Sequence, residues 1–237
     1  MNHARAALSN LADIPVDHAG IRYSRNPAQT VKLRLSDKSR FAGMMQVNYK
    51  VIDKDTYYRK GVFRHFTEDC ACSTSMTARI DATDLVRHSK ETGTRFYINF
   101  LYILSKVLNS REDYRMGYLR ETDELICYDV INPIQYIFHE DTETFTLVYT
   151  EYDEDYEKFY AAALRDAEEA KKTREYGFDI VNHPNWFDAS CIPWLSYDAM
   201  HLELPDVHMF FAPIINWGKY KEECSCTVRK QATENKR

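Results

Sequence analysis

The stretch that decides the fold is FDASCIPWLSYDAMHLELPDVHMFFAPIINWGKY, residues 187–220. It contains two runs, residues 190–197 and 209–217, that are rich in β-branched, aromatic and other apolar side chains. Proline or aspartate residues flank both runs, and residues of these types commonly mark the ends of strands. The stretch therefore predicts two β-strands in the C-terminal half of the chain.

The composition of the 237 residues is that of a globular protein with a core of ordinary size. Apolar residues make up 44% of the chain and charged residues 28%, while only seven glycines and seven prolines argue against linkers. The net charge of −5 favours neither a nucleic-acid nor a membrane partner. No window has the apolar run of a signal peptide or a membrane span, so we expect a cytoplasmic protein.

Six cysteines, at positions 70, 72, 127, 191, 224 and 226, are expected to stay reduced in that compartment. They include two Cys-x-Cys pairs. Residues i and i+2 of a strand face the same way, so either pair could offer two zinc ligands. Zinc sites usually use wider ligand spacings than this. We therefore prefer small buried apolar side chains as the interpretation and predict no metal.

The chain divides by its patterning into three parts. Residues 1–48 lack periodicity, and residues 21–40 carry six Lys or Arg against one Asp. Such a basic arm can bind nucleic acid, but it is more often a solvated, loosely ordered extension. We predict a disordered extension over 1–48, a domain over 49–221 and a separate tail over 222–237.

Helices and strands are expected to alternate within the domain. Asp55 is a candidate N-cap for a helix whose apolar residues recur at three- or four-residue intervals, and alternation over residues 72–80 predicts a half-buried strand. Asp81 and Gly93 should bound a second helix. Apolar stripes predict two longer helices, over 96–108 and 153–173, and shorter apolar runs predict strands over 114–119, 124–131, 134–139 and 143–151. This order, without repeats, predicts one α/β domain with helices layered on a mixed sheet.

Several motifs occur in an order and at spacings that resemble the chloramphenicol acetyltransferase family. They cover residues 53–221 and comprise Tyr58-Arg59-Lys60, Cys72 to Asp81, Phe96-Tyr97, Phe138-His139-Glu140, Thr142-Glu143-Thr144-Phe145, Pro193-Trp194, Phe211-Ala212-Pro213-Ile214 and Gly218-Lys219-Tyr220. The resemblance implies a two-layer α/β sandwich, with a mixed β-sheet and packed helices, of the coenzyme A-dependent acyltransferase fold. It also implies a homotrimer with its site between subunits.

The activity implied by the resemblance is transfer of acetyl from acetyl-CoA, as co-substrate, to a hydroxyl of chloramphenicol or a related alcohol. In the family, a His takes the hydroxyl proton, the alkoxide attacks the thioester, and a Ser hydroxyl helps to hold the oxyanion. That His belongs to a His-His-x-x-x-Asp-Gly motif, but here Lys221 is followed by EECSCTVRKQATENKR. We therefore expect a family fold that is incomplete at its C-terminus, no catalytic residue and impaired turnover.

Individual positions carry over from the family as binding residues. Phe66 and Cys72 correspond to residues that line the chloramphenicol pocket, with Phe66 in place of a Tyr. Asn216 corresponds to a Thr near the oxyanion, and its amide could still donate a hydrogen bond there. Lys219 and Tyr220 correspond to coenzyme A contacts, a charge for phosphate and a ring for adenine. Without the resemblance these would be read as core or surface residues.

Two further positions depart from the family. Ala199 stands where the family has the oxyanion Ser. Arg59 corresponds to the Arg that pairs with the missing Asp, so it would need another partner or remain solvated. His139, His201 and His208 are alternative bases, but none lies in a motif that would orient and tune it.

The sequence leaves three functions open. The first is an acetyltransferase whose sequence is truncated or frame-shifted near Glu223, and the second is a non-catalytic relative that binds coenzyme A or a protein partner. The third is a decayed fragment with exposed apolar faces and strand edges, which would aggregate.

Overall fold

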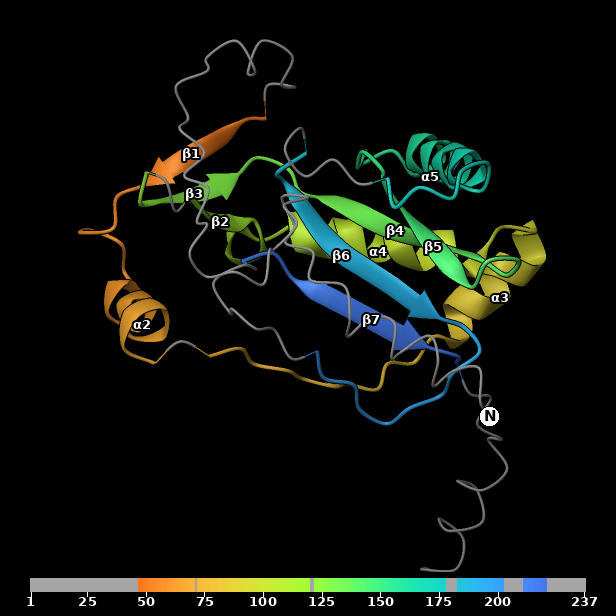
Figure 1. The fold of residues 1–237 in the computed structure, drawn as a ribbon, viewed down its shortest axis with the longest axis horizontal. Helices are drawn as coiled ribbons and strands as arrows, with labels where there is room; N and C mark the ends of the chain where they lie inside the picture. Colours follow the sequence, from red (N-terminus) through yellow and green to blue (C-terminus); the bar gives the residue numbers. More distant parts are fainter. Residues whose placement is uncertain (1–46, 71, 120–121, 178–182, 203–210, 221–237) are drawn as a thin grey trace, which may run out of the picture.

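The computed structural model describes residues 47–70, 72–119, 122–177, 183–202 and 211–220. Residues 1–46 of the predicted disordered extension over 1–48, and the predicted tail over 222–237, therefore lie outside the described residues. Two sheets form (Figure 1): an antiparallel one in the order β1-β3-β2 and a mixed one in the order β5-β4-β6-β7. Their strands are β1 (Tyr49–Ile52), β2 (Met116–Leu119), β3 (Glu124–Tyr128), β4 (Asn132–His139), β5 (Thr144–Tyr149), β6 (Trp186–Ile192) and β7 (Ile214–Gly218).

Both pairing modes occur in the four-stranded sheet. β4 and β5 form an antiparallel hairpin, whereas β4, β6 and β7 run parallel to one another. Parallel neighbours need long crossover connections, and α5 (Tyr156–Ala170) lies in the connection between β5 and β6. The α/β class with a mixed sheet is thus confirmed.

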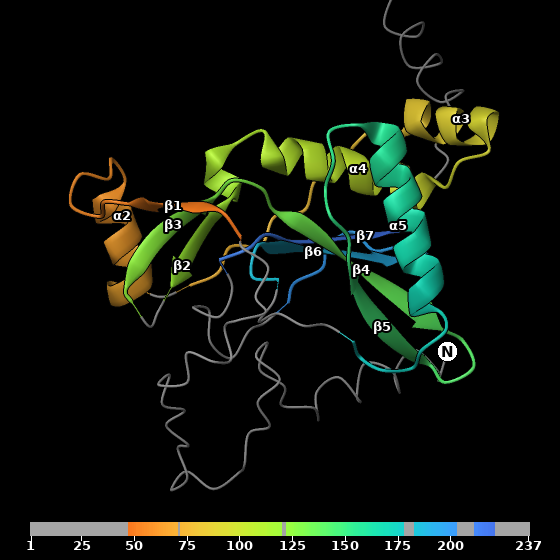
Figure 2. The ribbon, with the colours of Figure 1, turned by 90° about the horizontal axis from the view of Figure 1, so that it is seen from above.

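Two long helices form the second layer of the sandwich. α4 (Phe96–Asn109) and α5 lie over the same face of the four-stranded sheet, as Figure 2 shows. Their apolar stripes are the reason, because Ile98, Leu101 and Phe159 are almost fully buried there. They pack in one cluster with Phe187 and Ala189 of β6. The predicted helices over 96–108 and 153–173 are confirmed.

Hydrogen bonds at the helix ends explain where the helices begin and stop. Asp155 accepts from the backbone N–H of Glu157 at 3.0 Å and so caps α5. α3 (Thr83–Thr92) ends at Gly93, whose φ of 67° is the left-handed conformation that glycine adopts readily. The predicted bounds of that helix hold, with Asp81 accepting from the N–H of Thr83 at 2.9 Å.

A smaller apolar cluster lies on the sheet face away from α4 and α5. Ile134, Leu147 and Trp186 are its buried members. Side chains of paired and alternate residues share a face, so Asp188 of β6 and Ile214 of β7, which are paired in register, lie on this side as well. Asn216, two residues further along β7, also belongs to this face.

The expected first helix begins later than predicted. Asp55 does not cap it: α2 spans only Lys60–Arg64 and continues into a π-helical turn, η1 (His65–Asp69). Two hydrogen bonds to the Asp53 carboxylate hold the preceding residues in a turn instead: one from the backbone N–H of Asp55 at 3.0 Å and one from the hydroxyl of Thr56 at 2.9 Å. An Asx-type turn therefore competes with the helix start.

The predicted half-buried strand over 72–80 is wrong. That segment is extended but exposed throughout and joins neither sheet. Its recorded contacts are through side chains: Ser75 donates to the carbonyl of Met200 at 3.2 Å, and Arg79 meets Asp198 at 3.4 Å. Alternating apolar residues form a half-buried strand only when a neighbouring ladder is available.

The two strands of the opening stretch form, but with different bounds. β6 begins four residues before the predicted 190–197 strand and stops at Ile192, since its register with β4 pairs Trp186 with Asn132. β7 occupies only the end of the predicted 209–217 strand, and residues 203–210 lie outside the described residues. No helix of the described part is long and apolar enough to cross a membrane.

Candidate functional site

Asn216 on β7 is held by a side chain from the segment that follows β6. The hydroxyl of Tyr197 donates to Oδ1 of Asn216 at 2.9 Å. Both side chains are half-buried, and burial raises the pKa of Tyr197, which keeps the hydroxyl protonated as a donor. Sequence reasoning missed Tyr197, because a separation of nineteen residues carries no motif.

The turn that carries Tyr197 lies tightly against the end of β7. The N–H of Leu195 donates to the carbonyl of Ile192 at 3.0 Å, and the N–H of Lys219 donates to the carbonyl of Leu195 at 2.8 Å. A Cβ at Gly218 would lie 2.4 Å from that carbonyl oxygen and 3.0 Å from Cε1 of Tyr197. Glycine therefore permits a backbone approach that no other residue allows. Ala199, two residues after Tyr197, is exposed.

Lys219 and Tyr220 come directly after β7, and Tyr220 lies beside the start of α4. The ring of Tyr220 is 5.4 Å from the ring of Phe96, the first residue of α4. The side chain of Arg95 makes no capping bond, and its N–H donates to the hydroxyl of Tyr160 at 2.9 Å. The first turn of α4 is a positive helix end, which suits an anion such as phosphate. Phe96 was expected in a family motif and in the core stripe of this helix.

Two buried polar atoms lie between α4 and β7. The Tyr97 hydroxyl and the Trp217 Nε1 have no hydrogen-bond partner among the described residues. The two rings stack with their centroids 5.6 Å apart. Burial raises the pKa of Tyr97 far above its ordinary range, so its hydroxyl remains a donor.

The predicted acceptor residues lie elsewhere. Phe66 is in η1, with its side chain 47% exposed, and Cys72 is exposed with a free thiol. Figure 1 places α2, which precedes η1, at the opposite end of the molecule from the C-terminal end of β7. One subunit therefore brings Asn216, Lys219 and Tyr220 together but leaves Phe66 apart from them.

Arg59 pairs with Asp113, not with the Asp of the family motif. Its guanidinium lies 3.5 Å from the carboxylate of Asp113 and 5.0 Å from the ring of Tyr58. Arg111 contacts the same carboxylate at 2.8 Å, and this hydrogen bond, with Arg59, lowers the pKa of Asp113. The alternative partner that the sequence required is therefore present.

His139 has a structural environment. It is 4% exposed, and its Nε2 lies 2.8 Å from Oγ1 of Thr146. Thr146 donates its single proton to the carbonyl of Glu175 at 2.9 Å, so Nε2 of His139 must be the donor to Thr146. That nitrogen is thus not free to accept a proton from a substrate. His201 is exposed, and His208 lies outside the described residues.

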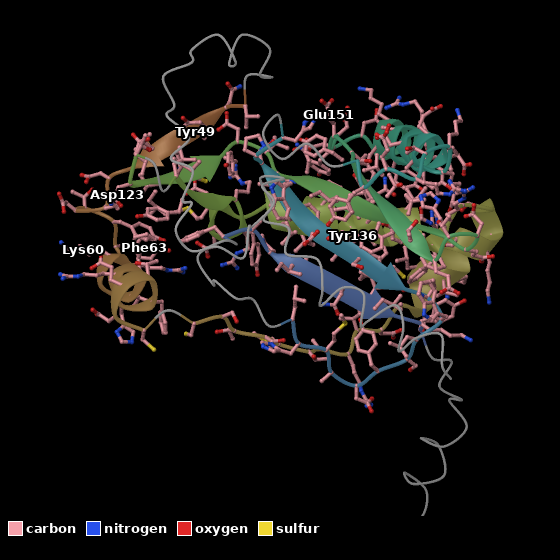
Figure 3. The ribbon with its side chains drawn as sticks, viewed as in Figure 1. Tyr49, Lys60, Phe63, Asp123, Tyr136 and Glu151 are labelled. Carbon is pink, nitrogen blue, oxygen red and sulfur yellow. The ribbon has the colours of Figure 1, made fainter. Side chains whose placement is uncertain are left out.

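A carboxyl group that no family motif includes is buried beside Tyr136, which Figure 3 labels over the four-stranded sheet. Asp188 is 6% exposed and accepts from the Tyr136 hydroxyl at 2.7 Å. Burial raises the pKa of Asp188 to about 6, against the opposing effect of that hydrogen bond. The pKa of Tyr136 is raised as well, first by burial. Asp188 is therefore a group whose charge should change stability with pH.

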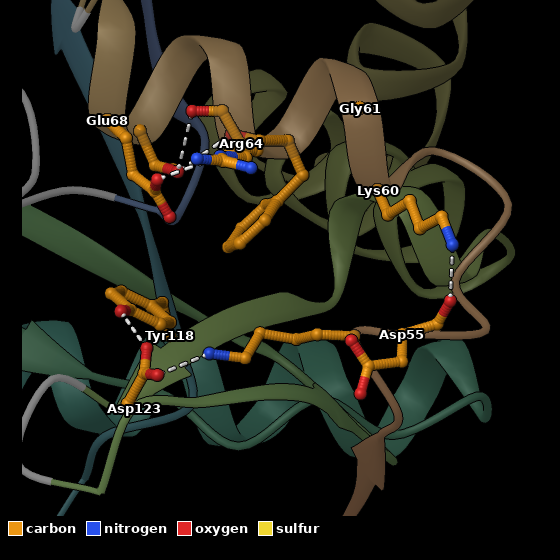
Figure 4. A pocket seen from close by; sticks show the side chains of 10 residues that line it. Asp55, Lys60, Gly61, Arg64, Glu68, Tyr118 and Asp123 are labelled. Atoms are coloured by element: carbon orange, nitrogen blue, oxygen red, sulfur yellow. Dashed lines mark hydrogen bonds and ion pairs between the residues drawn. The ribbon is translucent and has the colours of Figure 1, made fainter.

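A hollow of about 790 Å³ lies between α2 and β2 (Figure 4), and Lys219 is not among the residues that line it. Each cation that lines it meets an oxygen of the chain: Lys54 the carboxylate of Asp123 at 2.6 Å, Lys60 the carbonyl of Asp55 at 2.8 Å, and Arg64 the carboxylate of Glu68 at 3.1 Å. The carboxylates of Asp123 and Glu68 compensate the charges of Lys54 and Arg64, whereas the bond of Lys60 is to a neutral carbonyl. Among the described residues, no group of three or more His, Cys, Asp or Glu could hold a metal.

Comparisons with known proteins agree on one family. The family model described as chloramphenicol acetyltransferase matches residues 47–228. The chain is 33% identical to the chloramphenicol acetyltransferase of Proteus mirabilis over 180 residues, covering 74% of this chain and 79% of that one. It is 30% identical to that of Clostridium perfringens over 177 residues, covering 75% and 80%.

A solved structure of a chloramphenicol acetyltransferase shares the fold, with a TM-score of 0.61 at 19% identity over 74% of this chain and 84% of that one. The sequence match and the shared fold thus lead to the same conclusion. The chain belongs to the chloramphenicol acetyltransferase family.

Proposed function

We propose that this domain binds acetyl-CoA and provides the coenzyme and oxyanion sides of an acetyl transfer to a hydroxyl of chloramphenicol or a related alcohol. The observation that carries the proposal is the contact of Tyr220, which follows Lys219 at the end of β7, with Phe96 in the first turn of α4. A cation, a helix N-terminus and an aromatic face together match a nucleotide that carries phosphates.

The coenzyme side extends from this point toward Asn216. Lys219 is assigned to a phosphate of coenzyme A, and Tyr220 to stacking on the adenine. The pantetheine arm would then run along the face of β7 that carries Asn216, whereas Tyr97 and Trp217 lie on the opposite, helix-covered face.

The oxyanion side is assigned to the side-chain amide of Asn216. A tetrahedral intermediate places negative charge on the former carbonyl oxygen, and a fixed N–H donor stabilises that charge. Ala199 offers no hydroxyl, so the amide takes the larger share of this role.

The acceptor side is assigned to Phe66 and Cys72 of a second copy in a homotrimer. Large apolar side chains of α2, η1 and the 72–80 segment are exposed: Tyr58, Val62, Phe66, Met76 and Ile80. Apolar surface of this kind marks an interface, and a neighbouring subunit would bring the acceptor residues to the Asn216 of its partner. Light scattering should give a trimer mass, and Met76→Glu should shift it toward a monomer; a monomeric wild type would contradict the assignment.

Turnover by residues 1–237 alone should be slow, because they contain no His-His-x-x-x-Asp-Gly sequence. Loss of a general base typically costs 10²–10⁴-fold in rate. We expect thiol release from acetyl-CoA and chloramphenicol to be slower by about that factor than for the Proteus mirabilis relative under the same conditions. Comparable turnover that disappears on His139→Ala would instead identify His139 as the base.

Calorimetric titration with coenzyme A tests the binding assignment. Lys219→Ala and Tyr220→Ala should each weaken binding about 10- to 100-fold, since a charge-assisted bond or a stacked base is worth roughly 1.5–3 kcal/mol. Lys172→Ala, which removes a cation paired with Glu169 on α5 at 2.5 Å, is the control and should leave binding unchanged. Equal affinity for all four proteins would reject the site. Binding with no turnover at all would favour the non-catalytic relative.

A further inference from the structure

The amide of Asn216 is held in one of its two orientations. Oδ1 accepts from the Tyr197 hydroxyl at 2.9 Å, and no hydrogen bond of Nδ2 is recorded with the part of the chain that the structure describes. An amide that was free to rotate would present an oxygen to the ligand as often as an NH₂ group. A tyrosine hydroxyl can donate to the amide oxygen or accept from the amide nitrogen; here the Tyr197 hydroxyl donates to Oδ1, which leaves Nδ2 facing away.

Tyr197 can impose this orientation because its own position is fixed. Its turn is closed by the bond from Lys219 N–H to the Leu195 carbonyl and by the close approach at Gly218. The ring of Tyr197 thus packs directly on the backbone of β7, the strand that carries Asn216. A donor fixed on a rigid element loses little orientation when charge develops beside it.

We propose that Tyr197 is a positioning residue for acetyl transfer, which orients the Asn216 amide so that Nδ2 donates to the oxyanion. The inference rests on the proposed function. The acceptor hydroxyl oxygen attacks the thioester carbon, and the carbonyl electron pair moves to its oxygen, which Nδ2 then stabilises. The pair returns when the C–S bond breaks, and the coenzyme thiolate takes up the proton that left the hydroxyl. Tyr197 touches neither reactant.

The slow turnover of residues 1–237 is a suitable readout, since without the base motif it depends mainly on binding and on oxyanion stabilisation. Tyr197→Phe keeps the ring and removes the hydroxyl, so kcat should fall about 10- to 100-fold while KM for acetyl-CoA stays within about twofold. Asn216→Asp keeps the acceptor for Tyr197 but loses the donor, and kcat should fall about 10²–10³-fold. Tyr102→Phe is the control, because it also removes a hydroxyl bond, of 2.7 Å to the carbonyl of Glu154, and should leave kcat unchanged.

The combination of the two variants separates positioning from a structural role. If Tyr197 acts only through the amide, Tyr197→Phe should lower kcat no further in an Asn216→Asp background. An equal loss in both backgrounds, or an unchanged kcat in Tyr197→Phe alone, would overturn the inference. The inference would also be overturned if the wild type bound coenzyme A but released thiol no faster than the reaction without protein. A wild type that fails to bind coenzyme A would instead overturn the proposed function, and this inference with it.

Discussion

The buried carboxyl group of Asp188 should make the stability of the domain depend on pH. Its pKa rises from 3.8 to about 6 in the folded chain, chiefly through burial. A raised folded pKa means that the folded state binds the proton more tightly than the unfolded state does. The stabilising contribution is therefore complete below pH 3.8 and is lost as the pH rises through about 6.

The size of the stability change follows from the difference between the unfolded and folded pKa values of Asp188. A pKa that rises from 3.8 to about 6 corresponds to about 3 kcal/mol of the free energy of unfolding. Asp188 is 6% exposed, so solvent screening reduces this only modestly. Several exposed carboxylates with lowered pKa values, such as Asp81 and Asp123, act in the opposite direction at acid pH. The wild-type curve alone is therefore not diagnostic.

Asp188→Asn isolates the effect, because the amide has nearly the same shape, still accepts from Tyr136 and does not titrate. Urea unfolding of both proteins should be measured from pH 4 to pH 8. The stability of the variant relative to the wild type should rise by about 2.4 kcal/mol over this range, with most of the change between pH 4 and pH 6.5. A relative stability that is constant with pH would refute the assignment of a buried titrating carboxyl.

Two further changes test the connections around the site. Gly218→Ala should lower the free energy of unfolding by about 1–3 kcal/mol, because its Cβ would meet the Leu195 carbonyl at 2.4 Å and force the turn away from β7; a thermal midpoint equal to that of Gly61→Ala, where the added Cβ meets open space, would contradict this. Asn99→Leu should cost about 1–3 kcal/mol by chemical unfolding, since buried Asn99 bonds Ser89 at 2.9 Å, Thr94 at 2.8 Å and Tyr156 at 2.7 Å and so joins α3, α4 and α5. An unchanged unfolding midpoint would show that these bonds add nothing to stability.

The helices could be predicted from the sequence because their signals are local. The stripes of α4 and α5 repeat every three or four residues, and a capping Asp and a closing Gly lie beside α5 and α3. The strand over 72–80 could not be predicted correctly, since its pattern requires a hydrogen-bonded neighbour that no local pattern specifies. β6 was misplaced for the same reason: its register with β4 draws Asp188, a residue that disfavours strands, into a buried strand centre.

The site was predictable only in part. A predicted strand is enough to bring together Asn216, Lys219 and Tyr220, because these residues lie within five positions of one another in the sequence. The Tyr197 hydroxyl, which orients Asn216, comes from the segment after β6, and it reaches Asn216 because that segment packs against β7 at Gly218. The start of α4, beside Tyr220, comes from a part of the chain more than a hundred residues away. The sequence around Phe66 and Cys72 does not indicate which surface of a second subunit would complete their pocket.

The most direct test of the proposed function is a coenzyme A titration followed by amide chemical shifts of the ¹⁵N-labelled chain. The account predicts saturable shifts that are largest at Arg95, Phe96, Lys219 and Tyr220, where α4 begins and β7 ends. Shifts confined to the hollow around Lys60 and Asp123, or no shifts at millimolar coenzyme A, would contradict it.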